Sequence, residues 1–78
     1  MRIRSPALII AFANVTEALA VERYCQEHAL PGRIIPVPRE VTASCGLAWK
    51  AAPGDREALT NALSAAGLSC EGVYIINI

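Results

Sequence analysis

The chain has 78 residues, of which 54% are hydrophobic and only 5% aromatic, and its seven basic side chains balance seven acidic ones. A chain of this length forms one domain, residues 1–78, with a core built mainly from Ala, Val, Ile and Leu. The balanced charge argues against a nucleic acid or an anionic membrane surface as the partner. No apolar run approaches the roughly 20 residues that span a bilayer.

The chain contains three cysteines, Cys25, Cys45 and Cys70, whose number and spacing indicate whether the protein works in a reducing or an oxidising compartment. An odd number fits poorly with a closed set of disulfides, and none of them forms the C-x-x-C pair typical of a zinc site. Residues 7–12 follow a basic start, as in a signal peptide, but this run is at the lower limit of about 7 residues and Pro6 stands at its beginning. We therefore expect a cytoplasmic protein with reduced thiols, without a metal or cofactor.

The first half of the chain has the pattern of a strand followed by a helix. Residues 7–12 are a short apolar run rich in branched side chains, which predicts a buried strand. Asn14 is a typical N-cap, and Glu17 stands three residues later, as in a capping box. Apolar side chains then recur at helical spacing, at Ala18, Val21 and Cys25. We interpret Cys25 as a core residue, and we expect Pro31 and Gly32 to end the helix.

The second half adds three strands and a second helix. The predicted strands cover residues 33–37, 47–51 and 72–78, and the second helix runs between an Asp55 cap and a Gly67 C-terminal residue. Pro36 cannot donate a ladder hydrogen bond, so its strand should lie at a sheet edge.

The order βαββαβ predicts an α+β, ferredoxin-like fold. Right-handed crossovers give a four-stranded antiparallel sheet in the order 4-1-3-2, with both helices on one face. In this topology the loop between the second and third strands lies at the sheet end where the first helix begins. The turn that carries Cys70 lies at the same end.

The face of the sheet opposite the helices has no cover in this prediction. The first and last strands are apolar at both odd and even positions, whereas a sheet with one face in water should alternate. We therefore expect a homodimer that buries the open sheet face. The alternative is that these residues are ordinary scattered surface apolar side chains.

The loop between the second and third strands carries the candidate thiol, Cys45. The predicted topology puts it near the N-terminus of the first helix, where backbone N–H groups favour an anion. Arg39 is the candidate partner of the thiolate, and a neighbouring cation or helix N-terminus favours that form of a cysteine. Glu40 is the carboxylate of this loop and could assist a proton transfer. The alternative is that Cys45 is simply a small hydrophobic residue.

Four further residues complete the candidate site. The hydroxyls of Thr42 and Ser44 could bind an anion or a sulfur adduct, and Gly46 would let a partner approach. Cys70 is a candidate resolving thiol. However, one strand separates its strand from that of Cys45, which gives about 9.6 Å between them. A disulfide needs Cα atoms within about 7 Å, so this pair could close only if the loops moved.

The sequence PVPRE at residues 36–40, followed by SCGLA at residues 44–48, resembles the motif of a family of small selenium/sulfur carrier proteins. The resemblance implies a non-catalytic carrier rather than an enzyme. Cys45 would hold a persulfide or selenopersulfide, and Arg39 would be its charge partner. The implied partners are a donor, such as a cysteine desulfurase, and an acceptor, such as the enzyme of selenophosphate synthesis.

Two other functions compete with the carrier. The first is a dimeric interaction module, or a small-anion-binding module, in which Arg39, Thr42 and Ser44 bind an anionic metabolite and Cys45 is incidental. The second is a metal chaperone of the same fold, which would need paired cysteines between the first strand and the first helix. Residues 13–16 contain no cysteine, so this alternative is weak.

Overall fold

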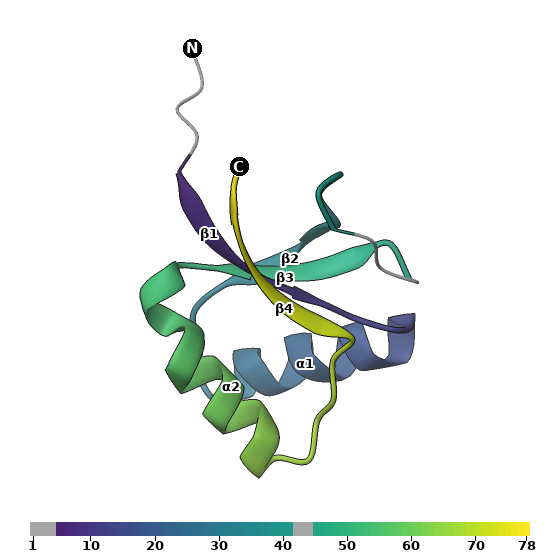
Figure 1. Ribbon diagram of the computed structural model, residues 1–78. Coiled ribbons are helices and arrows are strands. Elements are labelled where there is room, and N and C mark those ends of the chain that lie inside the picture. Colours follow the sequence, from purple (N-terminus) through teal and green to yellow (C-terminus); the bar gives the residue numbers. More distant parts are fainter. Residues whose placement is uncertain (1–4, 42–44) are drawn as a thin grey trace.

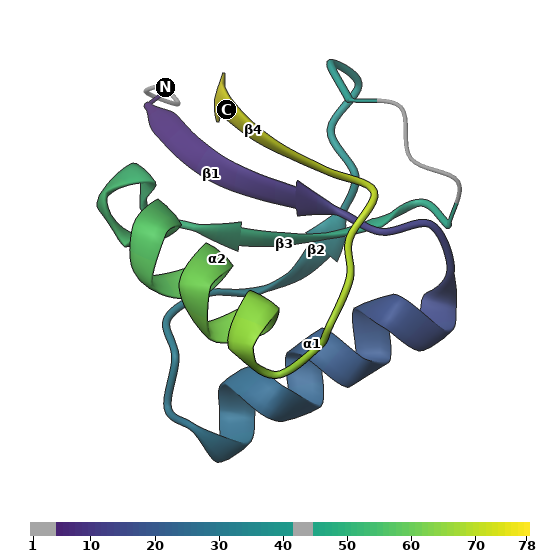
Figure 2. The ribbon, with the colours of Figure 1, turned by 60° about the horizontal axis from the view of Figure 1, so that its bottom comes forward.

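A computed structural model describes residues 5–41 and 45–78 of the chain. The elements in order are β1 (Pro6–Ala11), α1 (Val15–Glu27), β2 (Arg33–Pro36), β3 (Leu47–Ala51), the 3₁₀ turn η1 (Pro53–Asp55), α2 (Arg56–Ala65) and β4 (Gly72–Asn77) (Figure 1). The sheet has the order β2-β3-β1-β4, and each adjacent pair is antiparallel. Both helices lie on one face of the sheet (Figure 2). The predicted ferredoxin-like fold is confirmed, with Pro36 in an edge strand.

The N-terminus of α1 is fixed by a capping arrangement that the sequence predicted. Asn14 Oδ1 accepts a hydrogen bond from the Glu17 backbone N–H at 2.8 Å. The Glu17 carboxylate reaches back to the N–H of Ala13 at 2.9 Å, one residue before the cap itself. Together these contacts satisfy two donors at the start of the helix, and a cap of this kind stabilises it by about 1 kcal/mol.

The C-terminus of α1 comes earlier than predicted. The helix ends at Glu27, and Ala29 adopts a left-handed backbone with φ 53°. The N–H of Leu30 then donates to the carbonyl oxygen of Cys25 at 2.8 Å, which is the bond of a Schellman motif. The expectation that Pro31 and Gly32 end the helix is therefore wrong by a few residues, because the cap is a non-glycine residue that the pattern did not reveal.

The ends of α2 follow the sequence more closely. Asp55 occupies the N-cap position, although its side chain makes no capping hydrogen bond, because η1 leads into the helix. Gly67 has φ 72°, and the N–H of Leu68 donates to the carbonyl oxygen of Leu63 at 2.9 Å. This second Schellman motif confirms Gly67 as the C-terminal residue. Neither α1 nor α2 has the length and hydropathy of a membrane-spanning helix.

The main core lies between the sheet and the two helices. It consists of Leu8, Ile10, Phe12, Ala18, Val21, Cys25, Trp49, Ala51, Leu59 and Leu63. Cys25 is fully buried there, as predicted. The Trp49 indole N–H donates to the Pro31 carbonyl oxygen at 3.0 Å. Gly32 has φ 116°, and a Cβ at this position would overlap the Trp49 indole, so only glycine fits.

The opposite face of the sheet is covered in part by the chain itself, which corrects the expectation of a bare face. A second buried cluster contains Ala7, Ile9, Ala11, Val41 and Ala48. Val41 comes from the connection between β2 and β3, where its N–H donates to the Pro38 carbonyl oxygen at 3.0 Å. This turn folds Val41 onto the sheet, and Ile9 is completely buried without a second chain. Apolar positions on both faces of β1 therefore do not by themselves require a partner.

Candidate functional site

Cys45 comes two residues before β3, and the start of β3 pairs with the end of β1, where Ala48 is opposite Ala11. It therefore lies at the sheet end where β1 leads into α1, as predicted; Figures 1 and 2 label these elements. Pro36 is opposite Leu47 in the β2–β3 register, and the N–H of Val37 donates to the Gly46 carbonyl oxygen at 2.9 Å. The ladder therefore continues one step beyond the strands. Cys45 comes directly before Gly46, so the start of β3 fixes its position.

The sulfur of Cys45 is half-buried and held by the backbone of β3. The Leu47 N–H donates to Sγ at 3.4 Å, and the thiol lies 3.6 Å from the Leu47 carbonyl oxygen, to which it can donate. The side chain also packs against the core on the helix side of the sheet. An N–H directed at Sγ can donate to the thiolate form, and such charge-assisted hydrogen bonds are stronger than neutral ones.

Gly46 leaves the space beside Cys45 open. Its φ is 75°, a left-handed conformation that favours glycine, and a Cβ built here would have no atom within 4 Å. Glycine is thus needed for the backbone conformation and not because of crowding. The exposed surface at this position is available to a partner.

Among the described residues, no contact joins Arg39 or Glu40 to the sulfur of Cys45. Both side chains are exposed on the turn that precedes Val41. Within residues 5–41 and 45–78, neither takes part in an ion pair. Thr42 and Ser44, the two predicted hydroxyl ligands, lie outside the described residues. The roles assigned to these four side chains therefore stay predictions.

The N-terminus of α1 already has an anion, which is the chain's own carboxylate. Glu17 Oε1 accepts from the Ala13 N–H at 2.9 Å, and Glu17 Oε2 accepts from the Ser69 hydroxyl at 2.9 Å. The hydrogen bonds of Cys45 go instead to Leu47. The positive end of the helix dipole thus has Glu17 beside it, and the expected influence of this helix end on the Cys45 thiol stays a prediction.

Cys70 lies two residues before β4 and near Glu17; the residue is exposed overall, but it also lines a pocket with Leu63 and Val73. Burial of its sulfur raises the pKa of the Cys70 thiol, and the negative charge of Glu17 raises it further, while a backbone hydrogen bond from Gly72 acts in the opposite direction. Burial also raises the pKa of the Cys25 thiol. Neither of these two cysteines has an environment that favours the nucleophilic thiolate.

The spacing of the strands agrees with the predicted separation of Cys45 and Cys70. β1 lies between β3 and β4, and both cysteines are free thiols. The Ser69–Glu17 hydrogen bond could not be predicted from the sequence, because no local pattern links two residues that lie 52 positions apart. Within the described part of the chain, no three His, Cys, Asp or Glu side chains gather as a metal ion would require.

Comparison with known proteins identifies one family. The family model described as "Putative Se/S carrier protein-like" matches residues 7–75, which include all four strands except the ends of β1 and β4. No curated protein and no solved structure matches the chain. Because the family match covers nearly the whole chain, Cys45 and the connection before it belong to the matched region. The chain is therefore a member of the Se/S carrier protein-like family.

Proposed function

We propose that this protein is a non-catalytic carrier that holds one sulfur or selenium atom on Cys45. The observation that carries this proposal is the half-buried Cys45 sulfur, which receives the Leu47 N–H beside the open space at Gly46. Membership in the family supports it. Cys25 and Cys70 are less suited, because burial raises the pKa of both thiols.

Loading is a transfer between sulfurs without net oxidation. The Cys45 thiolate attacks the outer sulfur of a donor persulfide, the donor S–S bond breaks, and the donor thiolate leaves. The product is a persulfide on Cys45, or a selenopersulfide when the outer atom is selenium. A nucleophile of the acceptor then attacks the outer atom and restores the Cys45 thiolate. The Leu47 N–H would donate to the inner sulfur throughout the exchange. Exchange between sulfur atoms involves no metal or cofactor.

The side chains before Cys45 are proposed to serve the bound chalcogen. Arg39 would balance the negative charge of the adduct, and the hydroxyls of Thr42 and Ser44 would donate hydrogen bonds to it. Glu40 would accept or return a proton during exchange. Cys70 is proposed only as a secondary resolving thiol, because its raised pKa opposes attack at neutral pH.

The proposed partners are a cysteine-desulfurase-like donor and an acceptor enzyme such as the one that makes selenophosphate. These partners operate in a reducing compartment, and the three free thiols fit the cytoplasm. We propose that the carrier works there.

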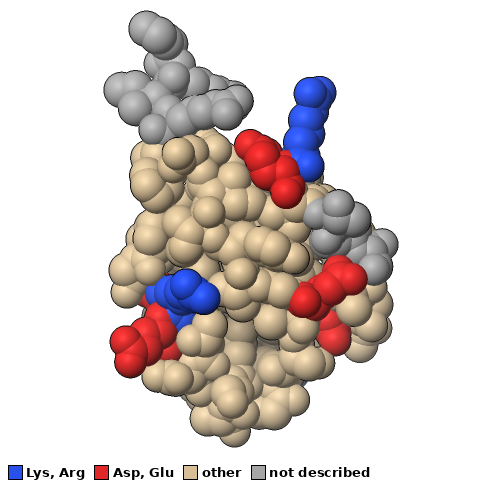
Figure 3. Space-filling model, viewed as in Figure 1, with Lys and Arg blue, Asp and Glu red and all other residues tan. Residues whose placement is uncertain are grey.

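We also propose that the protein is a homodimer through the β4 side of the open sheet face, where Val41 leaves Tyr74 uncovered. Tyr74 is 40% exposed on that face, in an edge strand without charge or proline. Residues 58–70 and 72–78 contain no charged side chain, and Figure 3 shows an uncharged surface over β4. The other edge strand, β2, is protected by Pro36 and Arg33. Edges without such protection tend to pair with another chain.

The carrier proposal is tested by the mass of the intact protein. The reduced chain is incubated with a cysteine desulfurase and cysteine, and a gain of one sulfur is expected in the wild type and in Cys70→Ser. The Cys45→Ser variant should show no gain. An adduct that persists in Cys45→Ser, or no adduct on the wild type, would show that Cys45 is not the carrier thiol. The second outcome favours the anion-binding module instead.

A further inference from the structure

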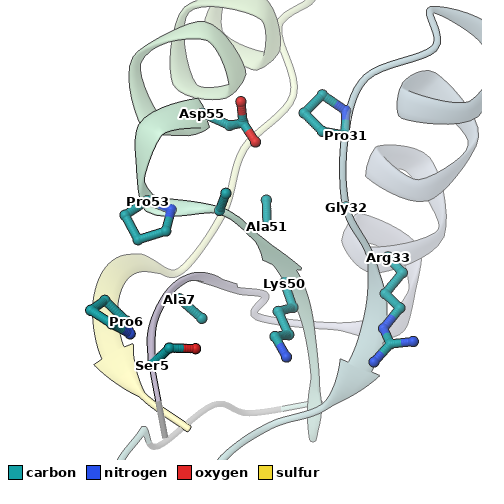
Figure 4. Close-up of a pocket in the computed structure, with 11 residues that line it drawn as sticks. Ser5, Pro6, Ala7, Pro31, Gly32, Arg33, Lys50, Ala51, Pro53 and Asp55 are labelled. Atoms are coloured by element: carbon teal, nitrogen blue, oxygen red, sulfur yellow. The ribbon is translucent and has the colours of Figure 1, made fainter. Parts of the chain in front are cut away.

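A second concave site lies at the end of the sheet opposite Cys45 (Figure 4). It is a cavity of about 520 Å³ between the starts of β1 and β2, the end of β3, and η1. This volume is within the range of roughly 300–1,000 Å³ that small-molecule sites occupy. Lys50 is five positions from Cys45 along an extended chain, which separates the two sites by roughly 16 Å. The cavity is therefore separate from the proposed carrier site.

Two cations line this cavity from neighbouring strands. Arg33 is directly opposite Lys50 in the β2–β3 register. Alternation along β3 puts Lys50 on the same face as buried Ala48, which is the face away from the helices. Figure 4 shows both side chains running in the same direction. Within residues 5–41 and 45–78, neither cation has a carboxylate at ion-pair distance.

This arrangement costs stability as long as nothing neutralises it. Like charges directly opposite each other on a sheet are destabilising. An anion between Arg33 and Lys50 would turn the repulsion into attraction. The guanidinium offers two parallel donors to an oxyanion, and the ammonium offers a compact charge.

The rest of the cavity suits a compact ligand. The Ser5 hydroxyl is directed toward the side of Lys50 in Figure 4. Two backbone hydrogen bonds with Ile78, at 3.2 and 3.1 Å, fix Ser5 in place. Pro6 and Pro31 form stiff walls, whereas Asp55 lies at the far end of the cavity, away from the ammonium of Lys50 (Figure 4).

We propose that this cavity binds a phosphate group, either free or carried by a small molecule, with Arg33 and Lys50 as its charged ligands and Ser5 as a further donor. A phosphate dianion matches the two positive charges, whereas a single carboxylate would leave one of them unbalanced. The site is separate from Cys45 and would bind a metabolite and not the carried chalcogen.

Titration of the full chain with inorganic phosphate, followed by amide NMR at constant ionic strength, tests this site. Saturable shifts are expected at Ser5, Gly32 and Lys50. Arg33→Gln and Lys50→Gln should each weaken binding about tenfold or more, because each removes a charge-assisted contact. Arg33→Lys keeps the positive charge but loses the two parallel N–H donors of the guanidinium, and it should weaken binding less than Arg33→Gln does. Arg23→Gln, which changes an exposed cation on α1, should leave binding unchanged.

The comparison of ligands identifies the source of the phosphate group. Tighter binding of a nucleoside monophosphate than of phosphate would assign the site to a phosphate ester, and equal or weaker binding would assign it to free phosphate. Absence of saturable shifts, or equal weakening by Arg23→Gln, would overturn the proposal. Tighter binding of a polyglutamate peptide than of phosphate would also overturn the proposal, because the site would then recognise carboxylates. Sulfur loading of Cys45 should be normal in Arg33→Gln, so failure here is distinct from failure of the carrier role.

Discussion

The carboxylate of Glu17 accepts a hydrogen bond from the hydroxyl of Ser69, 52 residues further along the chain, at 2.9 Å. The contact ties the first turn of α1 to the segment that enters β4. It also puts a negative charge near Cys70, whose thiol pKa is raised by burial first and by Glu17 second. The sheet end that carries Cys45 thus contains a second cysteine, whose thiol pKa is raised by its surroundings.

Replacement of that charge should make Cys70 more reactive. Glu17→Gln keeps an oxygen that can accept the Ser69 hydrogen bond but removes the negative charge that raises the Cys70 pKa. In a Cys45→Ser background, the pH profile of alkylation by iodoacetamide should move to lower pH, so that Cys70 reacts faster near pH 8. Glu57→Gln, at the start of α2, serves as the charge-matched control. A profile that stays in place or moves to higher pH would contradict the assigned cause.

Gly32 should tolerate no side chain. Gly32→Ala combines a positive φ of 116° with overlap between the new Cβ and the Trp49 indole. The free energy of unfolding should fall by about 1–3 kcal/mol, the cost of this kind of backbone strain. Gly54→Ala is the matched control, because a Cβ at Gly54 has no atom within 4 Å. Urea denaturation followed by Trp49 fluorescence measures both, and equal stability of the two variants would refute the steric explanation.

Val41 should stabilise the fold although it lies in a connection. Val41→Ala removes two carbons from the buried cluster that also contains Ile9 and Ala11, which should lower the free energy of unfolding by about 1–2 kcal/mol. Val15→Ala, at a position 49% exposed, should change stability by less than about 0.5 kcal/mol. Chemical denaturation compares the two variants. If both behave alike, the turn does not cover the sheet in solution.

If the protein is a homodimer through Tyr74, replacement of Tyr74 should lower the mass of the assembly in solution. The wild type should sediment as a dimer at micromolar concentration, and Tyr74→Lys should sediment as a monomer, because a charge on the uncovered face would be buried without a partner. Leu19→Lys is the matched control, since Leu19 is 54% exposed but lies on α1. A monomeric wild type would rule out the dimer, and a monomeric Leu19→Lys would move the interface to α1.

The local sequence determined most of the elements and their order. The cap at Asn14, the left-handed residue Gly67 and the edge position of Pro36 each follow from the stereochemistry of a single residue type. Once the order βαββαβ is known, the handedness of crossovers leaves one sheet topology. The same reasoning located Cys45 at the end of the sheet where α1 begins.

Only the tertiary structure decided which side chains meet at each end of the sheet. The turn that folds Val41 over Ile9 buries a face that alternation left open, because burial depends on a contact between distant segments. The local sequence puts Glu17 at the start of α1, but its hydrogen bond to Ser69 exists only because the segment before β4 folds back to this helix end. The pairing of Arg33 with Lys50 likewise exists only in the β2–β3 register. Periodicity and caps report on neighbours in the sequence, whereas charge and access at a site depend on neighbours in space.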